Sequence, residues 1–349
     1  MTTSAERSAT IKDVAFHASV SVATVSAVMN GNKYVSPELM QRVQESIATL
    51  GYKRNSFARG LKMQTSYSIG LIVPDITNPF FTNIARGVED VANTYNYSLI
   101  LGNTDEDPEK EKKYLHLLES KQADGLIIAV TARSHEYLQR LLLRDLALVS
   151  IDRSLFDLGI DTVMVDNKEG ARAAIEHLIA LGHRRIGFVT GLRGIAPTEE
   201  RLLGYTEALE KHGIAVDPAL IAMSYARVDG GERGAMQLLA LEDRPTALFP
   251  MDGTMAIGVL QAIAKCGLRC PEDIAIACFD DFIWASVMRP QLTVVAQPTY
   301  EIGKRAAHLL FERLQNRKSV PREIRLPTQL IIRESCGSQL GASGVDSSN

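Results

Sequence analysis

The chain has 349 residues, longer than one hydrophobic core usually sustains, so we expect two or three packed units. Hydrophobic residues make up 46% and charged residues 23%, and no apolar run approaches the roughly 20 residues of a membrane-spanning helix, which argues against a membrane protein. The net charge is −3, but the charged side chains are unevenly distributed along the chain. Residues 1–66 carry eight basic and four acidic side chains, so we expect this basic head, and not the acidic body, to approach a polyanion.

The N-terminal segment predicts a short amphipathic helix. Its first residues, MTTSAERSATIKD, lack the basic patch and apolar stretch of a secretory signal, so we expect a cytoplasmic protein. Thr10 is placed as the N-cap, and Asp13 follows in the first turn. The spacing of the next apolar residues indicates one helical face, formed by Ile11, Val14, Ala15 and Ala18.

A second helix is predicted to begin at Ser21, with Val22, Val25 and Val28 on one face. Two short helices this close together form a helix-turn-helix, whose second helix fits a DNA major groove. Spacing alone is equally compatible with a helical hairpin that only packs on another surface. The methyl groups of Val22, Ala23 and Ala27 suit contacts to thymine better than paired hydrogen bonds to a base.

Two further elements follow in the head. Ser36 and Pro37 indicate the start of a third helix, which ends at Gly51. Residues 53–62, KRNSFARGLK, are predicted to be only marginally helical by themselves because Gly60 interrupts them. An ordinary basic linker is the alternative for this segment.

From Ile69 onward, short apolar runs alternate with helical patterns, which predicts parallel, doubly wound α/β sheets. The rhythm restarts after VMVDN, so two similar lobes with a cleft between them are expected. Ligands of such sheets bind beyond the carboxyl ends of the strands. That rule selects residues at strand ends, namely Asp75, Asp105, Asp152, Arg153, Gly191, Asp252, Asp280 and Asp281. Carboxylates and a guanidinium suit the hydroxyls of a polyol, although each such residue could equally cap its strand.

No enzyme signature is found in the sequence. The motifs GxGxxG after the first strand, GxxxxGK[ST] and GxSxG are absent, and the seven histidines are scattered without an evident catalytic partner. The four cysteines, Cys266, Cys270, Cys278 and Cys336, lack CxxC spacing and a nearby histidine pair, so neither a zinc site nor a disulfide framework is indicated. No cofactor is expected. A transport-type binding protein is the other alternative, and the head together with the missing signal segment argues against it.

Several motifs resemble the lactose-repressor (LacI/GalR) family of bacterial transcription regulators. In the head these are DVA, S-x-x-TVS and the N-G at 30–31; in the body they include PDITNPFF (74–81), HLIALGHRRIGFVTG (177–191) and PQLTVVAQP (290–298). The resemblance covers roughly Thr10 to Ser335. It implies a regulator, expected to be a repressor, whose operator affinity is controlled by a small polar effector.

The resemblance assigns roles to individual residues of the head. Val22 and Ala23 match positions that help to select the operator, and Leu61 matches a leucine that a hinge helix inserts into the minor groove. Family members commonly place arginine or histidine where this chain has Ala27. The expected DNA contacts are Thr10, Ser21, Val22, Ala23, Thr24, Ser26, Ala27, Asn30, Asn55, Ala58, Arg59, Leu61 and Lys62.

In the body, Ile195 and Arg227 occupy positions where purine-responsive members carry an arginine and a phenylalanine, so a purine corepressor is not expected. A sugar, sugar acid or sugar phosphate fits better, with the face of Phe80, and with Trp284 beside it, as an aromatic platform. Together with Asp75 from the strand-end rule, the expected effector contacts are Phe80, Phe81, Asp152, Arg153, Ile195, Arg201, Arg227, Asp252, Asp280 and Trp284.

The expected domain organisation follows from these assignments. A helix-turn-helix domain (1–53) precedes a hinge helix and linker (54–67), a body (68–340) and a disordered tail (341–349). Within the body, we expect an N-lobe of about 68–165 plus 297–325 and a C-lobe of about 166–296 plus 326–336. A palindromic operator needs two heads, and the tail lacks the leucine heptads that make tetramers, so a homodimer is predicted. Its interface is expected along the outer helices, including Met255, Ile257, Val259 and Ile263.

Overall fold

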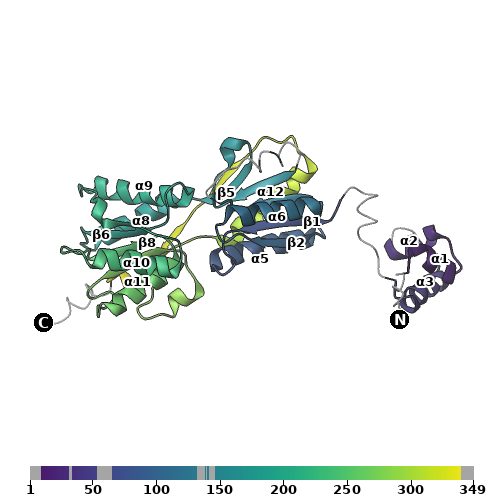
Figure 1. Ribbon diagram of the computed structural model, residues 1–349, viewed down its shortest axis with the longest axis horizontal. Coiled ribbons are helices and arrows are strands. Elements are labelled where there is room, and N and C mark those ends of the chain that lie inside the picture. The colour runs from purple at the N-terminus through teal and green to yellow at the C-terminus, as the bar shows by residue number, and fades with distance from the viewer. Residues whose placement is uncertain are drawn as a thin grey trace, which may run out of the picture. The chain divides into compact units, whose positions relative to one another are not determined.

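The computed structural model describes residues 9–30, 34–52, 65–131 and 146–338, together with Leu138 and Arg140. Contacts divide the chain into two units, Met1–Ser66 and Tyr67–Asn349 (Figure 1). We call them the head and the body. The expected DNA contacts Asn55, Ala58, Arg59, Leu61 and Lys62 lie outside the described residues, as do the side chain of Asn30 and the tail from residue 339.

The head contains the helices α1 (Ile11–His17), α2 (Val22–Asn30) and α3 (Pro37–Thr49). Thr10 and Asp13 form a capping box at the start of α1. Before α2, the Ser21 hydroxyl accepts a hydrogen bond from the backbone N–H of Thr24 at 3.0 Å. Helices α1 and α2 meet at 104°. This angle lies within the range of about 90–120° that is typical of a helix-turn-helix.

A small hydrophobic core holds the three helices of the head together. Its buried members are Val14, Ala15, Ala18, Val25 and Val43. Of the three valines expected on one face of α2, only Val25 is fully buried, whereas Val22 is 41% exposed. Ser36 precedes α3 as expected, but its side chain makes no capping hydrogen bond there. The start of α2 is therefore free of the core and presents its first side chains to the surroundings.

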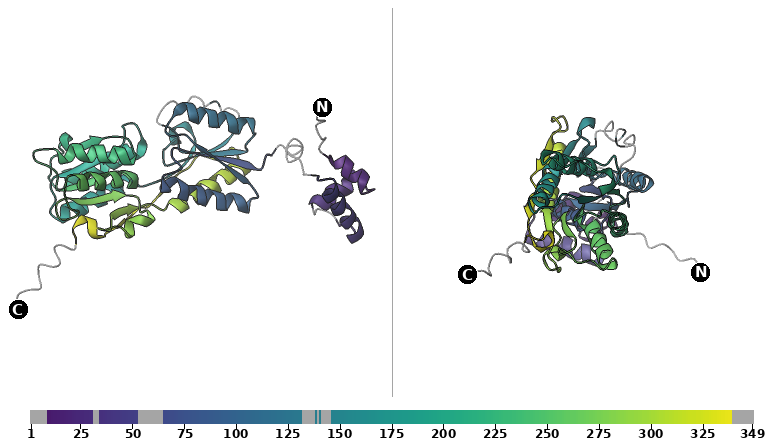
Figure 2. Two further views of the ribbon diagram at one scale, coloured as in Figure 1. Left: turned by 60° about the horizontal axis from the view of Figure 1, so that its bottom comes forward. Right: turned by 90° about the vertical axis from the view of Figure 1, so that its left-hand side faces the viewer.

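The first lobe of the body, the N-lobe, is a sheet with helices on both faces. Its strands are β1 (Ser68–Val73), β2 (Ser98–Asn103), β3 (Gly125–Ile128), β4 (Ala147–Ile151), β5 (Asp161–Val165) and β11 (Glu323–Leu326), and its helices include α5 (Pro79–Thr94), α6 (Pro108–Ser120) and α12 (Thr299–Gln315). The strand order is β11-β5-β4-β3-β1-β2, and all neighbouring strands run parallel. Helices α5 and α12 pack together on one face, and α6 covers the other (Figure 2).

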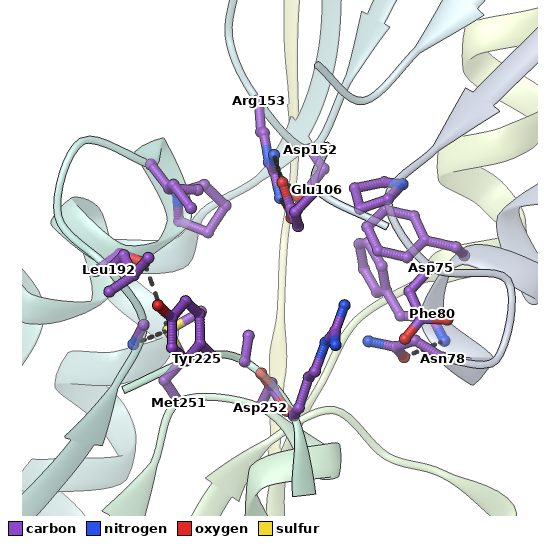
Figure 3. A pocket seen from close by; sticks show the side chains of 18 of the residues that line it. Asp75, Asn78, Phe80, Glu106, Asp152, Arg153, Leu192, Tyr225, Met251 and Asp252 are labelled. Carbon is purple, nitrogen blue, oxygen red and sulfur yellow. Dashed lines mark hydrogen bonds and ion pairs between the residues drawn. The ribbon is translucent and has the colours of Figure 1, made fainter. Parts of the chain in front are cut away.

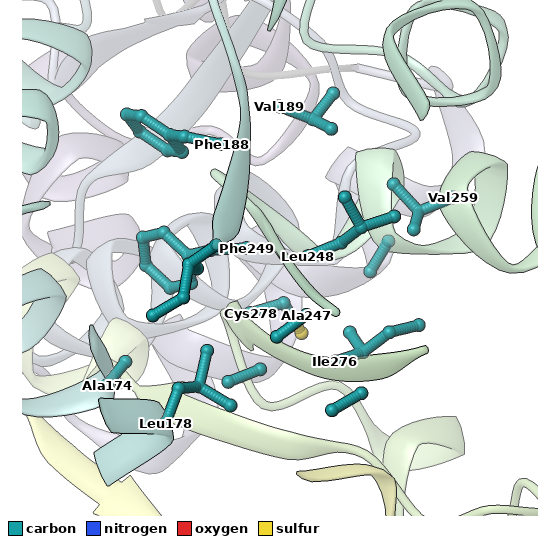
Figure 4. Packing of buried hydrophobic residues seen from close by; sticks show 14 of the residues in the cluster. Ala174, Leu178, Phe188, Val189, Ala247, Leu248, Phe249, Val259, Ile276 and Cys278 are labelled. Atoms are coloured by element: carbon teal, nitrogen blue, oxygen red, sulfur yellow. The ribbon is translucent and has the colours of Figure 1, made fainter. Parts of the chain in front are cut away.

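The second lobe, the C-lobe, repeats this plan. Its strands are β6 (Ile186–Thr190), β7 (Ile221–Met223), β8 (Ala247–Pro250), β9 (Ala275–Phe279), β10 (Thr293–Ala296) and β12 (Gln329–Ile331), and its helices are α8 (Asn167–Ala180), α9 (Ala196–Lys211), α10 (Val228–Leu239) and α11 (Gly253–Lys265). The order is β12-β10-β9-β8-β6-β7, with only β12 antiparallel to its neighbour. Stacked rings of Phe188 and Phe249, 5.4 Å apart, lie in its core (Figure 4).

The chain crosses between the lobes three times: after β5, after β10 and between β11 and β12. Each lobe therefore contains a segment from the C-terminal part of the chain. The two sheets have the same order of positions, so β4 in the N-lobe corresponds to β9 in the C-lobe. These three crossings hold the carboxyl ends of the two sheets on either side of one cleft.

Helices α10 and α11 pack closely through glycine. A Cβ added to Gly258 would lie 1.9 Å from the carbonyl oxygen of Val228, and one added to Gly231 would lie 2.2 Å from that of Met255. The expected dimer interface on α11 was wrong for three side chains: Met255, Val259 and Ile263 are at most 2% exposed and belong to the core of the C-lobe. Among its expected members only Ile257 keeps partial exposure. Because the glycines allow α10 and α11 to pack so closely, these three side chains of α11 point into the core of the C-lobe.

Candidate functional site: the cleft and the recognition helix

A cleft of about 710 Å³ lies between the carboxyl ends of the two sheets (Figure 3). The N-lobe lines it with Asp75, Asn78, Phe80, Phe81, Asp105, Glu106, Asp152 and Arg153, among others. The C-lobe lines it with Gly191, Leu192, Arg193, Ile195, Thr198, Arg201, Tyr225, Arg227, Met251, Asp252 and Asp280, and Gln297 lies at the second crossing. The structure thus brings together ten of the eleven expected effector contacts.

Trp284, the eleventh, does not line the cleft. Its ring packs edge-to-face on Phe282, with centroids 5.2 Å apart, and it contacts the hydrophobic cores of both lobes. Asp281, which the strand-end rule also selected, forms an ion pair with Arg333 at 2.8 Å instead. Asp281 directly follows Asp280, and Trp284 lies in the short 3-10 helix η3 (Ile283–Ser286), so neither side chain shares the direction of the strand-end residue.

Two aspartates occupy corresponding places in the two lobes. Asp152 follows β4 and Asp280 follows β9, and both have left-handed backbone angles, with φ of 64° and 72°. Such angles are uncommon for residues other than glycine and are found disproportionately at functional sites. Burial raises the pKa of Asp152, and it raises the pKa of Asp280 to about 6. Each carboxylate is therefore poorly solvated and would gain from hydrogen-bond donors on a ligand.

Arg201 is the buried cation of the C-lobe side, with 3% exposure. Its Nε donates to Asn167 Oδ1 at 2.9 Å, and its Nη1 donates to the backbone oxygen of Met251 at 2.7 Å. The guanidinium lies 3.8 Å from the ring centroid of Phe279, so stacking fixes its plane. These contacts use Nε and Nη1, which leaves Nη2 able to donate to a bound molecule.

Asp252 and Arg153 also have structural partners. Asp252 caps α11, because its Oδ1 accepts hydrogen bonds from Met255 N at 2.8 Å and Thr254 Oγ1 at 2.6 Å. Arg153 is paired with both carboxylate oxygens of Glu106 and lies 3.8 Å from Asp152. Arg153 is thus neutralised within the N-lobe, and the carboxylates of Asp152, Asp252 and Asp280 dominate the floor of the cleft.

Sequence reasoning missed several lining residues, among them Tyr225 and Glu106. Tyr225 follows β7, as does the expected contact Arg227, which immediately precedes α10. Applying the strand-end rule to the three-residue strand β7 would have selected Tyr225 as well. Glu106 lies in the turn after β2, where its negative charge gave no signal by itself. Among the described residues, no group of three or more His, Cys, Asp or Glu side chains could hold a metal ion.

In the head, Ser21, Val22 and Ala23 are exposed at the start of α2, whereas Thr24, Ser26 and Ala27 are partly buried. Exposed side chains at the N-terminal end of the second helix are those that contact base edges in helix-turn-helix proteins. In the described part of the chain, no single helix is long and apolar enough to span a membrane, although the bent pair α1 and α2 passes such a test by length and composition.

Comparisons with known proteins agree with this architecture. The family of bacterial regulatory proteins, lacI family, matches residues 10–55, and a periplasmic binding protein-like domain matches residues 175–336. The ribose operon repressor of Halalkalibacterium halodurans is 37% identical over 93% of this chain and 96% of its own length.

Two solved structures are similar as well. The Lac repressor dimer bound to operator and an anti-inducer superposes with a TM-score of 0.84 at 26% identity, over 95% of this chain and 99% of that one. A LacI family regulator from Enterococcus faecium with bound ribose has a TM-score of 0.71 at 31% identity, over 77% of this chain and 98% of that one. The predicted fold, with a helical head and two parallel-sheet lobes, is confirmed. The chain belongs to the lacI family of bacterial DNA-binding transcription regulators, which are not enzymes.

Proposed function

We propose that this repressor senses a sugar or a sugar derivative, bound in the cleft between its lobes. The observation that carries the proposal is the floor of the cleft, where the buried carboxylates of Asp152, Asp252 and Asp280 face Arg201. Carboxylates accept hydrogen bonds from vicinal hydroxyls, and guanidinium donates to ring or hydroxyl oxygens. The buried ring of Phe80 supplies an apolar wall for the carbon face of a sugar.

The relatives support this class of effector. The ribose operon repressor and the ribose-bound regulator from Enterococcus faecium point to pentoses. Arg193, Arg227 and Arg233 at the cleft also leave room for a sugar acid or a sugar phosphate. D-ribose is therefore the first compound to test, and acidic and phosphorylated sugars are the next.

The proposed output is operator binding by a homodimer in the cytoplasm. Helix α2 would enter the major groove and present Ser21, Val22 and Ala23 to base edges, with Thr24, Ser26 and Ala27 beside them. Thr10 would contact the phosphate backbone. The segment containing Leu61 would contact the minor groove between two such heads. This proposal is supported by the Lac repressor, which resembles this chain over 95% of its length and was solved as a dimer bound to its operator.

A ligand panel tests the effector class. The full-length protein is heated with D-ribose, other aldoses, sugar acids and sugar phosphates, and the melting temperature is recorded. A ligand present at 100 times its Kd adds about 2.7 kcal/mol of stability to the body. If no member of any of these three classes raises the melting temperature, the proposed effector class is wrong.

A substitution in the cleft then tests whether the effect of the sugar on operator affinity depends on this site. Arg201→Ala should bind operator DNA as the wild type does, yet lose the change in operator affinity that the active sugar causes, because a buried charged hydrogen-bond donor contributes about 1.5–3 kcal/mol. Arg172→Ala is the matched control, since Arg172 lies on α8 and pairs with Glu169 away from the cleft. Anisotropy of a labelled operator gives the result, and its sign distinguishes an inducer from a corepressor.

A further inference from the structure

A continuous set of polar contacts joins the two lobes behind the cleft. It begins at Arg201, whose Nε donates to Asn167 Oδ1 at 2.9 Å. The other end of the Asn167 amide, Nδ2, donates to Glu200 Oε2 at 3.1 Å. Glu200 Oε1 in turn accepts a hydrogen bond from Arg325 Nη1 at 2.9 Å. Arg325 lies on β11 of the N-lobe, whereas Glu200 lies on α9 of the C-lobe, so this last contact spans the lobes.

The contacts continue on the N-lobe side. Arg325 Nε donates to Glu323 Oε1 at 2.7 Å, and Glu323 Oε2 accepts from the Ser154 hydroxyl at 3.0 Å. Ser154 directly follows Arg153, which lines the cleft. We call Asn167, Glu200, Arg325 and Glu323 the relay. None of these four side chains lines the cleft, although the relay connects lining residues of both lobes.

The two contacts of Asn167 allow its side-chain amide only one orientation. Asn167 is fully buried, and its amide must present oxygen to Arg201 and nitrogen to Glu200. If Glu200 withdrew, the Nδ2 group would lose its short contact and keep only a 3.5 Å contact to the backbone oxygen of Val165. The orientation of the amide, and with it the position of the Arg201 guanidinium, therefore depends on Glu200.

Arg325 fixes Glu200 from the opposite lobe. Within the ranges that the structure describes, Glu200 and Arg325 form the one ion pair that joins the N-lobe to the C-lobe. Their side chains are 23% and 38% exposed, so the pair is partly desolvated but still open to screening by salt. An ion pair across a hinge has two states, made and broken, that depend on the angle between the lobes.

We propose that Glu200 and Arg325 are positioning residues, which hold Arg201 ready for the effector only while the lobes keep the angle at which their ion pair forms. Effector affinity then depends on an N-lobe residue outside the cleft. A lobe movement that breaks the pair releases Asn167 and weakens the grip of Arg201 on the bound molecule. This inference rests on the proposed sugar-sensing function.

The single tryptophan of the chain gives a readout that needs no ligand. Trp284 contacts the hydrophobic cores of both lobes, so its emission reports the packing between them. Arg325→Met removes the charge of Arg325 while keeping an unbranched apolar side chain. We expect this variant, without any sugar, to shift the emission of Trp284.

The matched control is Glu207→Gln. Glu207 lies on α9 like Glu200 and pairs with Lys168 of α8 at 3.4 Å with similar exposure, but that pair stays within the C-lobe. The control should leave both the emission of Trp284 and the effector affinity unchanged. Calorimetric titration of the full-length chain with D-ribose should show about threefold to fivefold weaker binding for Arg325→Met and Glu200→Gln, the loss of one partly exposed ion pair.

A double-mutant cycle separates the relay from a merely structural role. In an Asn167→Ala background the path to Arg201 is already cut, so adding Arg325→Met should not weaken D-ribose binding further. The same threefold to fivefold loss in that background would overturn the relay, as would unchanged emission of Trp284 in Arg325→Met. A third outcome is that the wild type does not bind D-ribose, while Arg325→Met still shifts the emission of Trp284 and Glu207→Gln does not. In that case ribose is the wrong sugar, and the role of the lobe-spanning ion pair is supported.

Discussion

Replacing Asp280 by asparagine should stabilise the body at neutral pH and weaken its effector site. Asp280 is 5% exposed, and burial raises the pKa of its carboxyl from 3.8 to about 6, although Arg201 offsets part of the effect. Between these two pH values the unfolded chain loses the proton before the folded chain does. Stability is therefore lost as the pH rises through this window, and a shift of about two pKa units corresponds to about 3 kcal/mol above pH 6.

The surrounding groups can accommodate the amide. Asp280 Oδ1 accepts from Gln297 Nε2 at 2.5 Å, and Oδ2 accepts from Gly253 N at 3.3 Å. The Oε1 atom of Gln297 is buried without a hydrogen-bond partner. Turning the Gln297 amide over would direct this oxygen at the new amide nitrogen. The substitution thus removes a poorly solvated charge, and the number of unpaired amide atoms at Gln297 stays at one, because Nε2 then takes the unpaired place of Oε1.

Urea unfolding of the full-length chain, followed by Trp284 fluorescence, measures the effect. We expect Asp280→Asn to be more stable than the wild type by about 3 kcal/mol at pH 8 and by about 1.5 kcal/mol at pH 5, where the wild-type carboxyl is largely protonated in the folded state. The same variant should bind the active sugar more weakly, because a carboxylate acceptor is lost. A stability difference that does not change between pH 5 and pH 8, or a less stable variant at pH 8, would refute this account of Asp280.

Three further predictions concern other parts of the chain. Leu61→Ala should weaken specific operator binding while leaving non-specific affinity nearly unchanged, since phosphate contacts dominate the latter; equal losses on both DNAs in anisotropy titrations would contradict the expected wedge. Gly258→Ala should lower the free energy of unfolding by more than about 2 kcal/mol, because its Cβ would lie 1.9 Å from the Val228 carbonyl oxygen; Gly267→Ala, where no atom lies within 4 Å but φ is +70°, should cost only the backbone strain of about 1 kcal/mol. Light scattering at micromolar concentration should give about twice the mass of one chain, and a stable mass near four chains would contradict the predicted homodimer.

The sequence predicted the alternation of strands and helices because each element has its own hydrophobic period. It also selected Asp152, Asp252 and Asp280, since parallel strands all end at the same edge of a sheet. Helix α10 was not among the predicted elements. Its three glycines lower its helical propensity. They are needed for the close contact with α11, which only the three-dimensional structure shows.

Pairings between distant residues were beyond sequence reasoning. Glu106 and Arg153 lie 47 positions apart, and Glu200 and Arg325 lie 125 positions apart. Charge alone gives no partner, because many arginines and carboxylates are available and surface pairs form with little preference. Trp284 was misplaced for a related reason: the resemblance fixes its position in the chain, whereas the short 3-10 helix Ile283–Ser286 decides which way its side chain points.

The three crossings between the lobes bear on how such a protein can be rearranged by evolution or by engineering. The head is one uninterrupted stretch of chain, so a single junction suffices to exchange it for the head of another regulator. Neither lobe of the body can be transplanted in this way, because the chain returns to each lobe after leaving it. Chimaeras joined near Ser66 should therefore combine a new operator preference with the old effector response, whereas a cut at the first or third crossing would divide one lobe and a cut at the second would divide both.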